Sequence, residues 1–212
     1  MILILFIFLL FAAGIFYIAK HPQFGRKPSG KRLKRILKSP HFKGGAFQNI
    51  HPTPQLAEET NMGKVMFRFL FGKAPRKKPT QNFNFNKTDL QNLSADENVL
   101  IWFGHSSYFM QIDGKKIMVD PVFSGNAAPF SFMGKAIPGT DLYSASDIPE
   151  LDYLILTHDH WDHLDYRTVT QLRSKVNKVI TGLGTGEHLE LWKYETSQII
   201  ELDWHEDFDL GN

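Results

Sequence analysis

The chain has 212 residues, a net charge of +2 and no cysteine. The absence of cysteine excludes a disulfide framework and thiolate ligation, so a bound metal must be held by His and carboxylate side chains. An apolar content of 42% is typical of a globular protein, and the length suffices for one well-packed domain with an appendage.

The first nineteen residues, MILILFIFLLFAAGIFYIA, contain no charged side chain. As a helix they would measure about 28 Å, close to the ~30 Å hydrocarbon thickness of a bilayer. A cleaved signal peptide is the alternative, but it requires a positively charged start and a small-residue cleavage site after the apolar run. We therefore predict a single-pass transmembrane anchor over residues 1–19.

Residues 20–95 form a basic neck and N-terminal extension, rich in Lys, Pro, Gly and Asn, which we expect to wrap onto a core. Basic residues beside a membrane helix favour the cytoplasmic side, so the main body is predicted to be cytoplasmic. The same charges would contact anionic headgroups of membrane lipid. Nucleic acid is the weaker alternative, and no nucleic-acid partner is expected. The run comprises Lys20, Arg26, Lys27, Lys31, Arg32, Lys34, Arg35, Lys38 and Lys43, with no acidic residue before Glu58.

Short apolar runs typical of strands begin after residue 96. The run 99–103 is followed by Gly104. Runs 108–112 and 117–120 flank Asp-Gly and predict a β-hairpin, which Pro121 ends because proline cannot donate to a ladder. A loop rich in Pro, Gly and Ser is expected over 121–150.

The rest of the chain alternates between strand and helix patterns. Strands are expected at 153–157, 178–181 and 198–203, and helices at 166–176 and 186–193. This rhythm predicts an α/β layer, and we assign residues 96–212 to one domain.

The segment HDHWDH, residues 158–163, follows the strand expected at 153–157. His158 and His160 are two apart, so an extended backbone would aim both rings the same way. Asp162 and His163 lie just beyond. Imidazole and carboxylate donors suit zinc, with iron or manganese as alternatives. A polar loop in which Asp165 caps the next helix is the simpler alternative, but it does not explain three His at the exit of a buried strand.

The same residues carry a resemblance to a known family. HDHWDH matches the HxHxDH signature of the metallo-β-lactamase superfamily, and its surroundings, WFGHSSYFMQIDGKKIMVDPVFSG (102–125) and ELDW (201–204), resemble the branch containing N-acylphosphatidylethanolamine-hydrolysing phospholipase D. The resemblance implies an αββα sandwich and two zinc ions, one bound by His158 and His160 and one by Asp162 and His163. It makes Asp162 the expected catalytic residue.

Two further residues belong to the expected surroundings of the metals. Asp120 matches the family's DP position and resembles a partner that orients a ligand His; a simple strand-ending turn before Pro121 is equally compatible. His105 follows a strand and either contacts the metals' surroundings or is a half-buried packing residue. His188 and His205 have no partner spacing, so we assign them to the surface or to packing.

The chain departs from the family at its C-terminal end. The family supplies a further His, an Asp that bridges both metals and a final His downstream, and these motifs are not found before Asn212. We therefore expect a truncated N-terminal half of the sandwich, with weak metal affinity, little activity and an apolar sheet face left uncovered.

These observations predict a membrane-anchored, zinc-dependent hydrolase, a phospholipase D-type phosphodiesterase on N-acylphosphatidylethanolamine-like lipids. Alternatives are a lactonase or other metallo-hydrolase of the same fold, a non-catalytic membrane-bound remnant, and last a nucleic-acid hydrolase. A homo-oligomer is compatible with the sequence.

Overall fold

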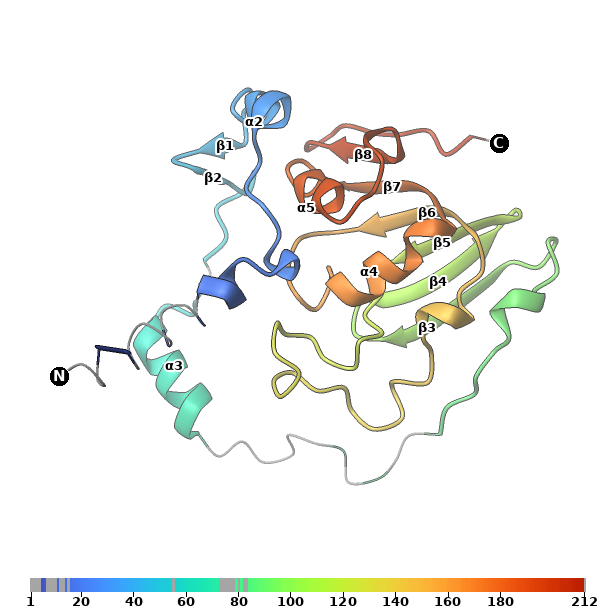
Figure 1. The fold of residues 1–212 in the computed structure, drawn as a ribbon, viewed down its shortest axis with the longest axis horizontal. Helices are drawn as coiled ribbons and strands as arrows, with labels where there is room; N and C mark the ends of the chain where they lie inside the picture. The colour runs from blue at the N-terminus through green and yellow to red at the C-terminus, as the bar shows by residue number, and fades with distance from the viewer. Residues whose placement is uncertain are drawn as a thin grey trace.

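A six-stranded mixed sheet is the centre of the computed structural model, with strands in the order β3-β4-β5-β6-β7-β8 (Figure 1). The structure describes residues 5–6, 11, 14, 16–54, 56–72, 79, 81 and 84–211. The strands are β3 (Val99–Gly104), β4 (Ser107–Ile112), β5 (Lys115–Val119), β6 (Leu151–Leu156), β7 (Val176–Gly182) and β8 (Ile199–Leu202).

The sheet combines an antiparallel meander with parallel strands. β3, β4 and β5 pair antiparallel, and β5 to β8 pair parallel. The β4–β5 hairpin closes through Asp113 and Gly114, both at positive φ, as a two-residue turn of this twist requires. This confirms the predicted hairpin. The parallel connections contain α4 (Tyr166–Leu172) and α5 (Gly186–Leu191), which confirms the predicted α/β layer.

Helices α4 and α5 cover one face of the sheet (Figure 1). Val169 and Leu172 of α4 and Leu189 of α5 are fully buried, and they pack with sheet residues such as Phe109 and Leu154 in one continuous core. The alternation of strand and helix therefore produces a two-layer α/β arrangement among the described residues.

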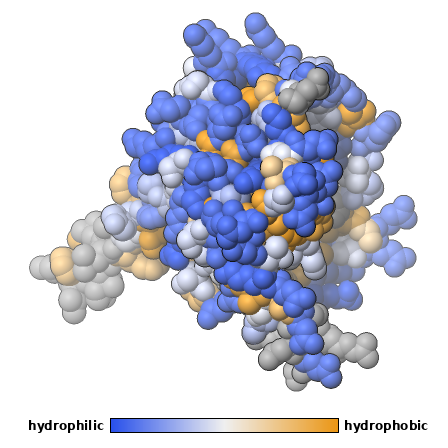
Figure 2. Space-filling model, turned by 90° about the vertical axis from the view of Figure 1, so that its right-hand side faces the viewer, coloured by the Kyte–Doolittle hydropathy of each residue, from blue (hydrophilic) through white to orange (hydrophobic). Residues whose placement is uncertain are grey.

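The opposite face of the sheet is partly covered. Ile117, Val119 and Tyr153 form a small second cluster there, and the Tyr153 hydroxyl donates to the carbonyl of Leu210 in the C-terminal segment. Leu100 on β3 stays 65% exposed. The face seen from the right-hand side of Figure 1 is mainly hydrophilic, with hydrophobic patches between the charged side chains (Figure 2).

The helix predicted over residues 166–176 is shorter than expected. Asp165 caps it, since its carboxylate accepts from the backbone N–H of Arg167. The α-helix ends at Leu172, and a 3-10 turn, Arg173–Lys175, leads directly into β7. Val176 therefore belongs to the sheet, where it pairs with Leu151. Spacing alone did not separate the last helical turn from the first strand residue.

Several elements were not predicted from the sequence. The neck contains α2 (Gly30–Ile36) and a two-stranded ribbon of β1 (Phe42–Lys43) and β2 (Ala46–Phe47), and α3 (Met62–Phe71) follows. The remaining 3-10 turns are Pro22–Phe24, Leu90–Asn92, Ala145–Asp147 and Thr196–Gln198.

Arg32 on α2 attaches the neck to the domain. Its guanidinium contacts Glu187 at 2.7 Å, Glu190 at 2.9 Å and Glu201 at 2.5 Å, and its side chain is only 11% exposed. Arg26 shares Glu187, and Arg35 pairs with Glu206. Three of the nine basic residues expected at a membrane are thus paired within the chain, while the lysines of the run are exposed.

The predicted anchor over residues 1–19 lies mostly outside the described residues. Within the part of the chain that the structure describes, none of the helices has both the length and the apolar character that crossing a membrane requires.

Candidate metal centre

The ends of three strands meet at one edge of the sheet. β3 and β5 both run antiparallel to β4, so they share a direction, and β6 is parallel to β5. The carboxyl ends of these strands therefore lie at the same edge. His105 follows β3, Asp120 follows β5, and Thr157 with the His/Asp motif follows β6.

Asp120 is the centre of the hydrogen bonds at this edge. It is 1% exposed, and its carboxylate accepts from the backbone N–H of Thr157 at 2.8 Å and from the Thr157 hydroxyl at 2.6 Å. The same carboxylate lies 2.8 Å from Nδ1 of His163. Asp120 therefore contacts both Thr157, which follows β6, and the ring of His163.

These contacts fix how His163 presents its ring. A carboxylate only accepts, so Nδ1 of His163 donates to Asp120, and Nε2 keeps its free lone pair. Nε2 lies 3.7 Å from Oδ2 of Asp162. Orientation of an imidazole by a carboxylate behind it is a recurrent arrangement at metal sites.

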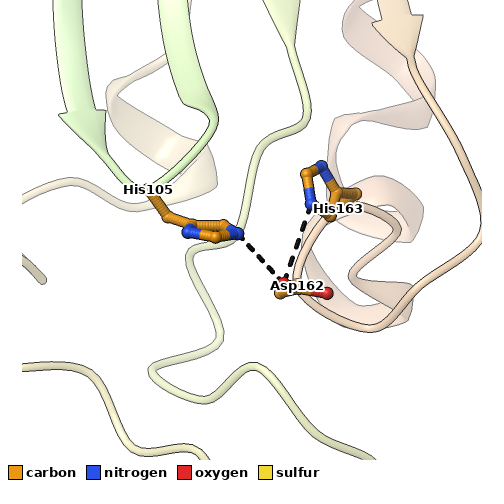
Figure 3. A group of neighbouring side chains, drawn as sticks. All are labelled: His105, Asp162 and His163. Atoms are coloured by element: carbon orange, nitrogen blue, oxygen red, sulfur yellow. Dashed lines mark hydrogen bonds and ion pairs between the residues drawn. The ribbon is translucent and has the colours of Figure 1, made fainter. Parts of the chain in front are cut away.

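Three donor atoms converge in front of His163. Nε2 of His105, Oδ2 of Asp162 and a ring nitrogen of His163 all lie within 4.8 Å of one another (Figure 3). His105 Nε2 and Asp162 Oδ2 are 3.0 Å apart. His105 reaches the cluster from the β3–β4 turn, so the structure places it among the donors rather than behind them.

His158 and His160 lie beside this group. The ring centroids of His158 and His163 are 3.9 Å apart, and those of His158 and His160 are 4.6 Å apart. The Thr157 hydroxyl uses its single proton on Asp120, so Nδ1 of His158, 3.0 Å away, must donate to it. Nε2 of His158 then has a free lone pair, as a metal ligand requires.

The protonation states also suit cation binding. Burial lowers the pKa of His158, and the neighbouring rings of His163 and His160 lower it further, so this imidazole is neutral at pH 7. Burial alone would raise the pKa of Asp162, but a backbone hydrogen bond and the rings of His163 and His105 outweigh it, and the pKa is lowered. The site thus offers a neutral imidazole at His158 and an ionised carboxylate at Asp162.

Two residues of the site have an unusual backbone. His105 has φ 47° and Asp120 has φ 42°, in the left-handed region that L side chains rarely adopt. Such conformations cost on the order of 1–3 kcal/mol each and concentrate at functional sites. Here they turn both side chains toward the His/Asp motif.

Sequence reasoning missed the role of Thr157 and the surroundings of His188. Nδ1 of His188 accepts from the backbone N–H of Arg26 at 2.9 Å, so its Nε2 carries the proton and faces Oδ2 of Asp159 at 3.8 Å. Asp159 therefore points to the neck rather than to the donor group. Its position between two His in the motif gave no signal of this.

The donor set fits a divalent cation. His105, Asp162 and His163 supply the nitrogen and oxygen donors that zinc, iron and manganese accept. The rings of His158 and His160 lie next to this group but do not belong to it. Zinc is compatible with these donors but is not singled out by them.

Comparison with known proteins agrees with this arrangement. Residues 115–212 match the model of the β-lactamase superfamily domain. A Mycobacterium tuberculosis protein of uncharacterised function is 28% identical over 79% of this chain and 45% of its own length. An N-acyl-phosphatidylethanolamine-hydrolyzing phospholipase D of Caenorhabditis elegans is 29% identical over 50% of this chain and 31% of its own length.

A third relative is named as a hydroxylase rather than a hydrolase. The 4-amino-L-phenylalanyl-[CmlP-peptidyl-carrier-protein] 3-hydroxylase of Streptomyces venezuelae is 31% identical over 56% of this chain and 23% of its own length. The chain thus spans less than half the length of each of these relatives. The segment similar to the β-lactamase superfamily domain, residues 115–212, contains strands β5 to β8, helices α4 and α5, and the His/Asp motif.

Proposed function

We propose that this chain carries part of the catalytic site of a metal-dependent hydrolase, and that the bond hydrolysed is a phosphodiester of a membrane phospholipid such as an N-acylphosphatidylethanolamine. The single observation that carries the proposal is the convergence of His105, Asp162 and His163, with Asp120 behind His163. Sequence similarity to a phospholipase D supports the substrate class.

Each residue of the site has a distinct role in this proposal. His158, His160, Asp162 and His163 are ligands as expected from the motif, and His105 joins Asp162 and His163. A bound divalent cation supplies a Lewis acid and a water of lowered pKa. Asp162 is the catalytic residue in this proposal, since its carboxylate is one of the three converging donors and its side chain is 37% exposed. Asp120 holds His163 in the tautomer whose Nε2 faces outward.

A lipid substrate agrees with the N-terminal region. The apolar residues 1–19 would anchor the chain in a bilayer, and the six lysines between Lys20 and Lys43 are exposed, so they remain free for anionic headgroups. The anchor would keep the catalytic edge close to the headgroup layer, with the body on the cytoplasmic side.

Metal titration combined with hydrolysis assays tests the proposal. The chain is titrated with Zn²⁺, Mn²⁺ and Fe²⁺ by calorimetry, and N-acylphosphatidylethanolamine and a lactone panel are assayed with and without chelator. Asp162→Asn should abolish metal-dependent hydrolysis of the phospholipid. Asp159→Asn is the matched control, because this carboxylate lies in the same motif but faces His188.

Metal-independent turnover, or lactone hydrolysis without phosphodiester hydrolysis, would contradict the substrate class. If His158→Ala and Asp162→Ala leave biological activity unchanged, a non-catalytic membrane-bound remnant is correct instead.

One observation favours a second candidate. The 31% identity to a hydroxylase, together with donors that suit iron, is compatible with an oxidative enzyme of the same fold. Iron retained on purification and oxygen consumption with substrate would favour the hydroxylase, whereas zinc and oxygen-independent turnover would favour the hydrolase.

A further inference from the structure

Helix α3 (Met62–Phe71) leaves an unusually large apolar surface uncovered. Asn61 caps it, because the Asn61 side chain accepts from the backbone N–H of Lys64 at 2.9 Å. Every residue from Asn61 to Gly72 is exposed. In Figure 1 the helix lies outside the layers of the sheet, at the left of the molecule. The large apolar side chains are Met62, Val65, Met66, Phe67, Phe69, Leu70 and Phe71, from 37% to 72% exposed.

The side chains of α3 are arranged around the helix by polarity. Lys64 and Arg68 are four residues apart, so they lie on one face. At 3.6 residues per turn, Met62, Val65, Met66, Phe69 and Leu70 lie on the opposite face. Phe67 lies at the border of the two faces, and Phe71, seven residues after Lys64, lies beside Lys64, with the two Phe ring centroids 5.2 Å apart. A continuous apolar face of this kind marks an interaction site.

The charge around α3 has one sign. No acidic residue occurs between Glu59 and Asp89 in the sequence, and the sequence after the helix is strongly basic. A helix with an apolar face, basic flanks and low overall acidity is typical of segments that lie in the plane of an anionic membrane surface. The basic residues of this stretch are Lys64, Arg68, Lys73, Arg76, Lys77, Lys78 and Lys87.

We propose that α3 docks into the surface of an anionic phospholipid bilayer, with its apolar face among the upper acyl chains and Lys64 and Arg68 at the headgroups. A ten-residue helix is about 15 Å long, so it can lie along the interface but not cross the ~30 Å core. A second copy of the chain is a poorer occupant, because it would bring two sets of like charges together. The inference does not rest on the proposed hydrolase function.

Docking of α3 differs from the contact expected of the neck. The neck lysines can only lie above headgroups, whereas α3 would enter the acyl region. Together with an anchor at residues 1–19, α3 would give the domain a second attachment and thus a defined orientation toward the lipid.

A fluorescent label on a single cysteine tests the proposal in the full chain, which has no native cysteine. Bimane is placed at Leu70→Cys on α3 and, as the matched control, at Leu100→Cys on β3; the two leucines are 61% and 65% exposed. Both proteins are added to phosphatidylcholine vesicles with and without phosphatidylglycerol, containing doxyl-labelled acyl chains. An anchor at residues 1–19 would tether both labels equally.

We expect the doxyl lipids to quench the label at position 70 and not the label at position 100, and we expect quenching to require phosphatidylglycerol. Lys64→Gln with Arg68→Gln should weaken the docking equilibrium by about thirtyfold, two surface charges at ~1 kcal/mol each. Equal behaviour of the two labels would overturn the proposal. The proposal would also be overturned if, without vesicles, the bimane emission at position 70 were shifted to the blue of that at position 100. Such a shift would mean that protein covers the helix.

Discussion

The neck, here residues 20–43 around α2, and helix α3 contain similar residues but make different contacts. Both are basic, both lack acidic residues, and both precede the domain in sequence. In the neck, the partly buried Arg32 contacts three carboxylates and Ile36 is 3% exposed. In α3, Lys64 and Arg68 stay exposed beside seven exposed apolar side chains.

The difference depends on partners that are distant in sequence. Glu187, Glu190 and Glu201 surround Arg32 on the domain surface. Burial alone would lower the pKa of Arg32, but its hydrogen bonds to the three Glu residues outweigh burial and raise the pKa. Basic composition alone therefore does not distinguish a segment that attaches to its own domain from one that leaves its apolar face free.

Arg32→Met should have the largest effect on stability. The substitution leaves Glu201, whose side chain is 11% exposed, without its cation and leaves the buried Glu187 with Arg26 alone. Removing one partner of a largely buried ion pair in this way costs up to about 3–5 kcal/mol. Urea unfolding measures the change. Arg35→Met is the control, because the Arg35–Glu206 pair is 45% exposed on both sides and should contribute at most ~1 kcal/mol. Equal losses of stability for the two variants would contradict the expected difference between the shielded Arg32 contacts and the exposed Arg35–Glu206 pair.

Two leucine-to-alanine substitutions compare how much side-chain packing stabilises the domain and how much it stabilises α3. Leu189→Ala removes a fully buried side chain and should cost about 2–5 kcal/mol. Leu70→Ala on α3 should stay within ~0.5 kcal/mol, because the side chain is 61% exposed. The midpoint of urea unfolding checks both. A large loss for Leu70→Ala would show that α3 packs against the domain.

Asp120→Asn tests the hydrogen bonds at the candidate metal centre, which do not involve Arg32 or its Glu partners. The amide keeps the shape but can present an N–H to His163, so the ring loses its fixed tautomer. We expect zinc affinity to fall about 10–100-fold, as for other groups that orient a ligand His. Isothermal calorimetry measures the change, and Asp159→Asn should leave the affinity within a few-fold. Unchanged affinity for Asp120→Asn would contradict the orienting role.

The pH dependence of stability should be the smallest effect. Burial alone would raise the pKa of Glu187, but its contacts with Arg32, Ser29 and Arg26 outweigh burial, so the pKa is lowered. The hydrogen bond from Arg32 also lowers the pKa of Glu190. A carboxylate with a lowered folded pKa stabilises the protein above its unfolded value of ~4.3, and this contribution is lost as the pH falls. Urea unfolding between pH 7 and pH 3 should show a weaker decline in Arg32→Met than in the unchanged chain.

Local patterns predicted the domain well because its signals are short-range. The Asp113-Gly114 turn, the apolar runs of the sheet and the Asp165 cap each act within a few residues. The end of α4 was missed because Val176 satisfies a helical spacing and a strand pairing equally well. Neighbouring residues do not decide between the two.

The candidate site could be predicted only in part, for a similar reason. The 158–163 motif is local and visible, but His105 joins it from 57 residues away through the parallel directions of β3, β5 and β6. Pairing of Arg32 with Glu187 spans 155 residues. Such contacts follow from strand order, which the sequence pattern did not specify.

Histidine ring-nitrogen NMR during a zinc titration tests most directly whether His105, Asp162 and His163 share one cation. We expect the Nε2 signals of His105 and His163 to shift together and saturate together, while Nδ1 of His163 keeps its proton against Asp120. His105→Gln and His163→Gln assign the signals. Zinc-induced shifts confined to His21, His41 and His51, with the rings of His105 and His163 unaffected, would contradict it.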